Sequence, residues 1–227
     1  MSPGRSTVAK SPHVRAKRER RREEILHAAL RAFRERGYHA TTLDHIAERL
    51  GVRKTALYHY FPDKEAILHE CHQDSLVQLE RILEASRALR SPRERLRYLI
   101  REHVRVMTDT LRGSPLAFEV QAFSEERRTE MIAGRDAYER ELRKTIERGV
   151  RAGEFRPVDP KLAVFAILGA INWIARWYRP EGELQADTIG DAFADHLMTG
   201  LGPAPRLSLA RRPRAAAPAA TRKRTTR

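Results

Sequence analysis

Five residues with hydrogen-bonding side chains lie close together in the segment that follows Gly51. They are Arg53, Lys54, Thr55, Tyr58 and His59. If this segment is a helix, Leu57 and Phe61 lie four residues apart and pack inward, which leaves the polar side chains pointing outward or sideways. Side chains of this kind contact phosphates and the edges of bases in the major groove of DNA. The segment therefore predicts recognition of a nucleic acid.

The polar residues of this segment are expected to divide into two groups. A recognition helix contacts bases mainly through its N-terminal residues. We therefore expect Arg53, Lys54 and Thr55 to face bases. Tyr58 and His59 come later in the helix and are expected to contact the sugar–phosphate backbone.

Three short helices are needed to position these side chains. The first is expected to run from Arg21 to Gly37, a residue typical of helix C-caps. The second follows with Thr41 or Thr42 as its N-cap and ends at Gly51. A third helix from about Lys54 to Phe61 completes a helix-turn-helix arrangement.

The stretch TTLDHIAERLGVRKTALYHYFPDKEAIL, residues 41–68, resembles the DNA-binding signature of TetR-family transcriptional regulators. The matching positions are Gly51, Val52, Leu57, Tyr58, Phe61 and Lys64, and the resemblance covers about residues 21–70. It implies that Thr42 caps the second helix beside a phosphate, and that Tyr58 and Lys64 contact the DNA backbone. Ala56 departs from the family pattern, because many members carry glycine, serine or threonine there.

The net charge of +14 is concentrated at the two ends of the chain. Residues 1–22 contain eight Lys or Arg and one acid, residues 203–227 contain eight and no acid, and the part between them is nearly neutral. Both ends are poor in large apolar residues, so 1–20 and 203–227 are expected to be disordered basic segments that either attract DNA or only solubilise the chain. The cations expected on the DNA backbone are Arg18, Arg20, Arg21 and Arg22.

The predicted fold class is all-α, because helix-forming residues dominate and no alternating strand pattern is sustained. Residues 21–70 are expected to form the helix-turn-helix domain and residues 71–202 a larger effector-binding and dimerisation domain. Further helices are expected at about 63–86, 92–113, 114–123, 125–152, 160–178 and 186–201.

The helix expected at 160–178 is apolar on nearly every side, which indicates burial all round. A second copy of the chain would provide that burial, and the TetR resemblance implies dimerisation through the last two helices. A homodimer is favoured over a large monomeric core. The interface residues expected are Ala163, Ala166, Gly169, Ala170, Phe193 and Leu197.

A body of this size favours a cavity for a small-molecule effector. Residues 155–184 are similar to the C-terminal region of TetR-family members that respond to acyl-coenzyme A thioesters, which implies that Trp173, Arg176 and Trp177 flank the pantetheine arm. A polar Asn172 and Arg176 on an apolar helix need partners, either Asp187, Glu181 or an anionic ligand. The full set of pocket residues expected is Met107, Phe118, Phe123, Tyr138, Trp173, Arg176 and Trp177.

Other classes of protein fit less well. A single cysteine, Cys71, indicates a reducing compartment, and no apolar run is long enough for a membrane span, so a cytoplasmic, nucleoid-associated protein is expected. No catalytic or metal site is predicted, and His69 and His72 are interpreted as part of a helix face. The sequence therefore predicts a repressor released from a palindromic operator by an effector such as an acyl-CoA. A regulator of an efflux pump that responds to drugs or aromatic compounds, and a non-specific nucleoid protein, are the alternatives.

Overall fold

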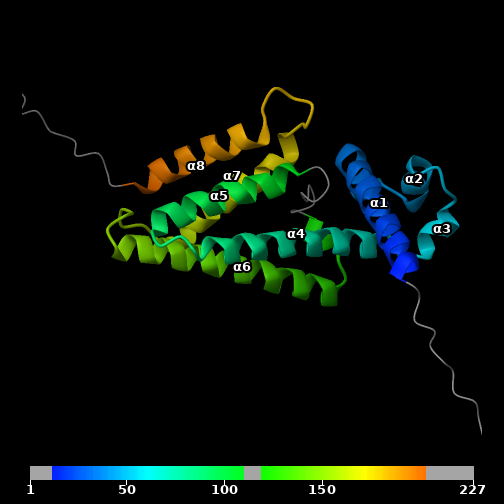
Figure 1. Ribbon diagram of the computed structural model, residues 1–227, viewed down its shortest axis with the longest axis horizontal. Helices are drawn as coiled ribbons and strands as arrows, with labels where there is room; N and C mark the ends of the chain where they lie inside the picture. The colour runs from blue at the N-terminus through cyan, green and yellow to red at the C-terminus, as the bar shows by residue number, and fades with distance from the viewer. Residues whose placement is uncertain (1–11, 110–118, 203–227) are drawn as a thin grey trace, which may run out of the picture.

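The computed structural model describes residues 12–109 and 119–202 and contains, within these ranges, eight α-helices, one 3-10 helix and no strand. The predicted all-α class is confirmed. Helices α1–α3 form a head at one end, and α4–α8 form an elongated body (Figure 1). The elements are α1 (Pro12–Arg36), α2 (Leu43–Arg49), α3 (Lys54–Tyr58), α4 (Lys64–Ser86), α5 (Pro92–Thr108), η1 (Glu119–Ala122), α6 (Glu125–Arg151), α7 (Pro160–Trp177) and α8 (Ala186–Leu201).

Helix α1 begins nine residues earlier than expected, at Pro12 rather than Arg21. The prediction of disorder was therefore wrong for residues 12–20. Their composition explains the difference, because alanine, arginine, lysine and glutamate are strong helix formers and proline is well suited to a first helical position. The rest of the two basic segments, 1–11 and 203–227, lies outside the described residues, as does Phe118.

Local hydrogen bonds explain why several helices begin where the sequence predicts. The carboxylate of Asp63 accepts a hydrogen bond from the backbone N–H of Ala66 at the start of α4. Ser91 caps α5, and Asp159 caps α7 with Pro160 at the first helical position. Helix α5 ends at Thr108, five residues before the expected end. Of the helix expected at 114–123, residues 119–123 are described, and they contain the 3-10 helix η1.

Two hydrophobic cores share helix α4. Its first half contributes Ile67, Leu68 and Cys71 to the core of the head, and its second half packs Leu79 and Leu83 against the core of the body. The head core also contains Phe123 and Met131, which come from the region around the start of α6. Residues 21–71 therefore do not form a closed core of their own.

Helix α5 runs through the centre of the body, and α8 lies against it in the antiparallel direction (Figure 1). Three arginines of α5, spaced four residues apart, face three similarly spaced aspartates of α8. The ion pairs join Arg97 to Asp195, Arg101 to Asp191 at 3.0 Å and Arg105 to Asp187 at 2.8 Å. Asp187, one of the two acids considered as partners of Arg176, thus receives a hydrogen bond from α5.

Helix α7 buries only one of its apolar faces within the chain. Val164, Ile167, Ile171 and Ile174 point into the body core at helical spacing. Leu162, Phe165 and Trp173 are exposed, with Trp173 59% accessible. None of the described helices is long and apolar enough to cross a membrane.

Candidate functional site: a helix-turn-helix head coupled to a body cavity

Helices α2 and α3 form the predicted helix-turn-helix. Gly51 adopts φ of +64° in the turn between them, a conformation that favours glycine. Leu57 and Phe61 are each 1% exposed and pack into the head core, as their spacing predicts. Their burial turns the remaining side chains of α3 away from the core.

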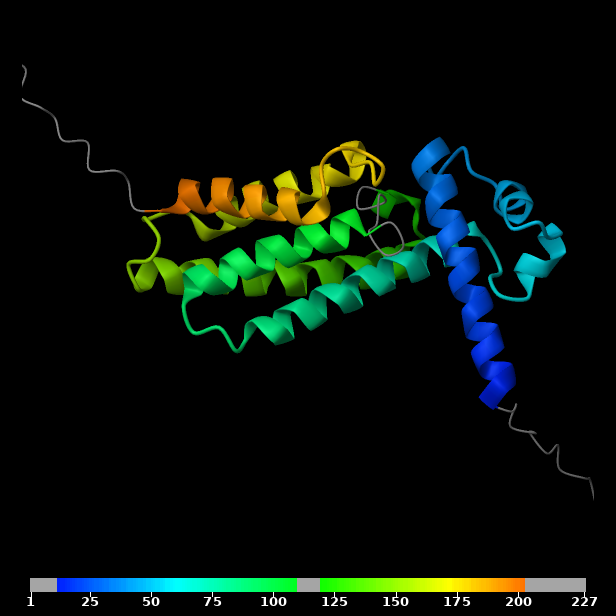
Figure 2. The same cartoon turned by 45° about the horizontal axis from the view of Figure 1, so that its top comes forward.

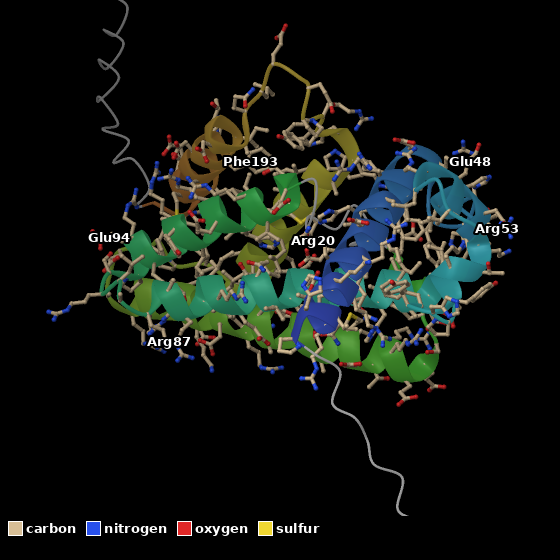
Figure 3. The ribbon with its side chains drawn as sticks, turned by 45° about the vertical axis from the view of Figure 1, so that its right-hand side comes forward. Arg20, Glu48, Arg53, Arg87, Glu94 and Phe193 are labelled. Atoms are coloured by element: carbon tan, nitrogen blue, oxygen red, sulfur yellow. The ribbon has the colours of Figure 1, made fainter. Side chains whose placement is uncertain are left out.

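The residues expected to face bases lie at the outer edge of the head. Arg53 and Thr55 are exposed, and Figure 3 shows Arg53 pointing outward there, on the same side as Glu48 of α2. Lys54 forms an ion pair of 2.9 Å with Asp44 at the start of α2. Arg53 and Thr55 are therefore accessible to a ligand. Lys54 would have to break or share its ion pair with Asp44 before it could contact a base.

Three of the residues expected on the DNA backbone are exposed on the head. Thr42 caps α2, because its hydroxyl accepts a hydrogen bond from the backbone N–H of His45 while the His45 ring accepts one from the Thr42 N–H. Tyr58 is 50% exposed, and His59 is exposed at the end of α3. The cap is confirmed, and contact of these three residues with phosphates stays a prediction.

Lys64 makes contacts within the head. Its ammonium donates hydrogen bonds to the carbonyl oxygens of Tyr38 at 2.8 Å and Thr41 at 2.9 Å, and it lies 4.2 Å from the centre of the Tyr38 ring. Loss of solvent lowers the pKa of Lys64. The residue therefore ties the loop between α1 and α2 to the start of α4. Its contact with the DNA backbone stays a prediction.

Arg22 has a similar internal role. Its guanidinium forms an ion pair with Glu70 of α4, donates to the carbonyl of Tyr60 at 3.2 Å and lies 4.7 Å from the centre of the Phe61 ring. The expected DNA contact from Arg22 also stays a prediction. Arg21 pairs with Glu24, whereas Arg18 and Arg20 are exposed.

A cavity of about 370 Å³ lies in the body between α4, α5, α6 and α7. Its apolar wall includes Leu76, Leu79, Val106, Met107, Met131 and Leu168. Its polar wall includes His72, Ser75, His103, Arg135, Tyr138 and Asn172. A concave site with an apolar lining and a few polar groups is the usual form of a small-molecule binding site.

A buried histidine and tyrosine form the polar centre of this cavity. The Tyr138 hydroxyl and His103 Nδ1 are 3.3 Å apart, and the two rings meet edge to face. Burial, and secondly the positive charge of Arg135, lowers the pKa of His103 to about 4. His103 is therefore neutral at neutral pH and can offer a hydrogen bond without adding charge.

Of the six predicted pocket residues that the structure describes, two lie on this cavity wall, Met107 and Tyr138. Trp173 and Arg176 are exposed, and Trp177 packs against the body core, so the pocket predicted from these three residues was wrong for this cavity. The reason is the rotation of α7 about its own axis. Its isoleucines and Val164 face inward, so Asn172 borders the cavity and Trp173 does not. Phe123 is buried in the head core.

The cavity and the head core share a wall. Met131 lines the cavity and belongs to the head core, and it is almost fully buried. His72 also lines the cavity, and its ring lies 5.3 Å from the Phe123 ring of the head core. A molecule in the cavity would therefore touch side chains that pack directly against the head.

Polar contacts that the sequence did not indicate join the start of α4 to the start of α6. The Glu65 carboxylate accepts a hydrogen bond from the Ser124 N–H at 2.8 Å and lies 3.3 Å from Arg127. The hydrogen bond from Ser124 and the charge of Arg127 lower the pKa of Glu65. His69 lies 3.1 Å from Glu130 one turn further along. These pairs are about sixty residues apart in sequence, so no local pattern marks them.

The expected dimer-interface residues lie on or beside the outward face of α7 and α8. Ala166 and Gly169 are exposed, and the other four are half-buried: Ala163, Ala170, Phe193 and Leu197. A Cβ atom built on Gly169 would meet nothing within 4 Å. Figure 3 shows Phe193 on α8. Together with the exposed Phe165 and Trp173, these residues make an apolar surface that the single chain leaves uncovered.

A helix-turn-helix head, joined by one long helix to a helical body with a cavity, is the architecture of a DNA-binding transcriptional regulator. Two family descriptions match the chain, "Bacterial regulatory proteins, tetR family" over residues 25–71 and "Tetracyclin repressor-like, C-terminal domain" over residues 89–201. The chain belongs to the TetR family of transcriptional regulators, as the resemblance in residues 41–68 predicts. Members of this family bind DNA and are not enzymes.

Known relatives cover about four fifths of the chain. The HTH-type transcriptional repressor KstR2 of Rhodococcus jostii (strain RHA1) is 32% identical over 196 residues, which cover 80% of this chain and 91% of the relative. The structure of the TetR family regulator PfmR from Thermus thermophilus is 37% identical with a TM-score of 0.71, over 79% of this chain and 99% of PfmR. AibR in complex with isovaleryl coenzyme A and operator DNA is 28% identical with a TM-score of 0.70, over 81% of this chain and 98% of AibR.

Proposed function

We propose that the chain is a ligand-responsive repressor that leaves its operator when a small effector fills the body cavity. The observation that carries this proposal is the wall shared by the cavity and the head core. Because Met131 and His72 contact both, an effector that displaces either side chain changes the packing beneath the helix-turn-helix. The cavity is therefore placed where its occupant can change the orientation of the head.

The effector acts through a difference in affinity between two arrangements of the head. It must bind the arrangement that does not fit the operator more tightly than the arrangement that does. A preference of roughly 10⁴-fold moves a population from 1:99 to 99:1. Helix α4 transmits the change, because one half of it packs in the head core and the other half packs in the body.

The effector class that we propose is an acyl-CoA thioester. The apolar wall formed by Leu76, Leu79, Val106 and Leu168 suits an acyl chain, and the volume of about 370 Å³ suits the acyl end of such a molecule. The His103–Tyr138 pair is placed to hydrogen-bond a carbonyl oxygen. The AibR structure, described with isovaleryl coenzyme A and operator DNA, supports the same effector class in a related protein.

We further propose that the functional unit is a homodimer formed through the outward faces of α7 and α8. Leu162, Phe165 and Trp173 are exposed in the single chain, and small residues at 166 and 169 permit close approach of a second helix. Two heads about one helical turn of DNA apart, ~34–36 Å, would match a palindromic operator. A symmetric dimer is also the commonest assembly of soluble proteins.

Fluorescence anisotropy tests these proposals. The purified protein is titrated onto a labelled fragment from upstream of its own gene, with excess random competitor DNA, and then with a series of acyl-CoAs and free aromatic compounds. Binding that resists competitor and is released by one acyl-CoA class is the expected result. Release by aromatic compounds alone would show that the effector is an aromatic compound and not an acyl-CoA. If the competitor DNA displaces the protein completely, sequence-specific binding to that fragment is contradicted.

A cavity-filling variant locates the effector site. Leu168→Trp places a larger side chain at the cavity wall and should abolish release while leaving operator binding intact. Ile132→Trp is the matched control, because Ile132 lies on the exposed side of α6. Unchanged release in Leu168→Trp would show that the effector binds elsewhere.

A further inference from the structure

The first turns of α1 form a rigid extension of the head. Pro12 to Arg20 are helical and exposed, and Figure 2 shows this end of α1 projecting beyond the other helices of the head, on the side where α3 lies. Arg22 anchors the helix at its base through Glu70, the Tyr60 carbonyl and the Phe61 ring. The extension therefore has a fixed direction relative to the recognition helix.

One face of the extension borders a basic groove of about 610 Å³. The groove is lined by His13, Ala16, Lys17, Arg20, Arg21 and Glu24 of α1, and by Tyr60, which follows α3. These α1 residues recur at intervals of three and four, so they share one side of the helix. Arg15 and Arg18 belong to other sides of the helix and do not line the groove.

Two cations in this groove have no acidic partner in the part of the chain that the structure describes. Arg21 pairs with Glu24, which neutralises both charges. Lys17 and Arg20 form no ion pair with any of the described residues. The groove therefore presents two positive charges and the polar side chains of His13 and Tyr60 beside the end of α3, a set of groups suited to a polyanion.

We propose that this groove binds about two phosphates of the DNA backbone that flank the base pairs contacted by α3. The proposal rests on the proposed function, because it assumes that α3 enters the major groove. Lys17 and Arg20 neutralise the phosphates, and the Tyr60 hydroxyl donates to a phosphate oxygen. Because the cations are mounted on a helix, less conformational freedom is lost on binding than with a flexible arm.

The salt dependence of DNA binding gives the expected size of the effect. The slope of log K against log salt changes by about 0.9 for each phosphate that a protein neutralises. Loss of both cations should therefore lower the magnitude of the slope by about 1.8. Extrapolated from 1 M salt, this corresponds to roughly 30-fold weaker binding at about 0.15 M salt. Operator and random DNA should weaken by the same factor, because phosphate contacts carry no sequence information.

The test compares two double variants of the full chain with equal loss of charge. Lys17→Ala/Arg20→Ala removes the groove cations, and Arg140→Ala/Arg151→Ala removes two exposed cations from α6 in the body. Alanine preserves the helix in both, which circular dichroism checks. We expect the slope to fall by about 1.8 in the groove variant and to change little in the control. Equal changes in both variants would show a diffuse charge effect and overturn the proposal. An unchanged slope in both variants would also overturn it.

The same measurement on a random duplex separates this proposal from the proposed function. If the wild type lacks competitor-resistant binding to the operator fragment, the repressor proposal fails at that fragment, while the slopes on random DNA still test the groove. If the wild type binds the operator specifically but the two double variants behave alike, only the groove proposal fails. Tyr60→Phe should weaken binding without changing the slope, since a neutral hydroxyl releases no counterion.

Discussion

Replacing Lys64 with methionine separates a structural role from a DNA contact. Methionine keeps an unbranched apolar side chain of similar length, so the stem can still pack against the Tyr38 ring. The ammonium and its hydrogen bonds to the carbonyls of Tyr38 at 2.8 Å and Thr41 at 2.9 Å are lost. The perturbation therefore removes the tie between the α1–α2 loop and the start of α4.

The magnitude follows from the contacts. Hydrogen bonds to a charged group contribute about 1.5–3 kcal/mol. Burial opposes this contribution, as the lowered pKa of Lys64 indicates, and partly exposed carbonyls can bind water after the substitution. We therefore expect the free energy of unfolding to fall by about 1.5–3 kcal/mol in total. In a chain of this size the midpoint of thermal unfolding should then fall by roughly 3–12 °C.

Two measurements on the same samples test this reasoning. Urea unfolding gives the change in stability, and anisotropy titrations across salt concentrations give the slope for DNA at a temperature where both proteins are folded. We expect Lys64→Met to lose stability with an unchanged slope. Lys17→Met is the counterpart and should keep its stability while its slope falls by about 0.9. A Lys64→Met variant of wild-type stability whose slope falls by about 0.9 would refute the structural role.

Three further outcomes are expected. His103, whose pKa is lowered to about 4, binds its proton less readily than in the unfolded chain, so between pH ~6.5 and ~4 the free energy of unfolding falls as pH falls. The fall in the free energy of unfolding approaches ~1.4 kcal/mol per pH unit. Urea unfolding at several pH values should show a smaller pH dependence of stability in His103→Gln. Gly149→Ala places a Cβ 2.1 Å from the buried Phe155 ring and should cost about 1–3 kcal/mol in thermal or urea unfolding. Phe165→Asp should shift the dimer towards monomer in light scattering, whereas Ile132→Asp, an exposed site on α6, should not.

The parts of the fold that depend on local sequence were predictable. Thr42, Asp63 and Asp159 each cap a helix through a side chain that accepts from an N–H two or three residues away. The helix-turn-helix depends on a glycine with positive φ and on apolar residues at helical spacing, both visible in the sequence. The exposed positions of α3 follow from these local features alone.

The contacts that the sequence did not indicate join residues that are distant in sequence. Lys64 binds carbonyls 23 and 26 residues away, and Arg22 binds a carboxylate 48 residues away. No spacing rule connects such positions, so neither contact is visible in the sequence. Trp173 was misplaced for a different reason, because a helix that is apolar on all sides does not indicate which face packs inward.

The head core has a consequence for how such regulators can be recombined. A head taken as residues up to Cys71 would leave behind Phe123 and Met131, which complete its packing from the region around the start of α6. A chimera with a junction early in α4 would therefore join a head to side chains that never packed against it. We therefore expect exchange of the head between two such proteins to require the transfer of these two residues as well, so the unit of exchange is discontinuous in the gene.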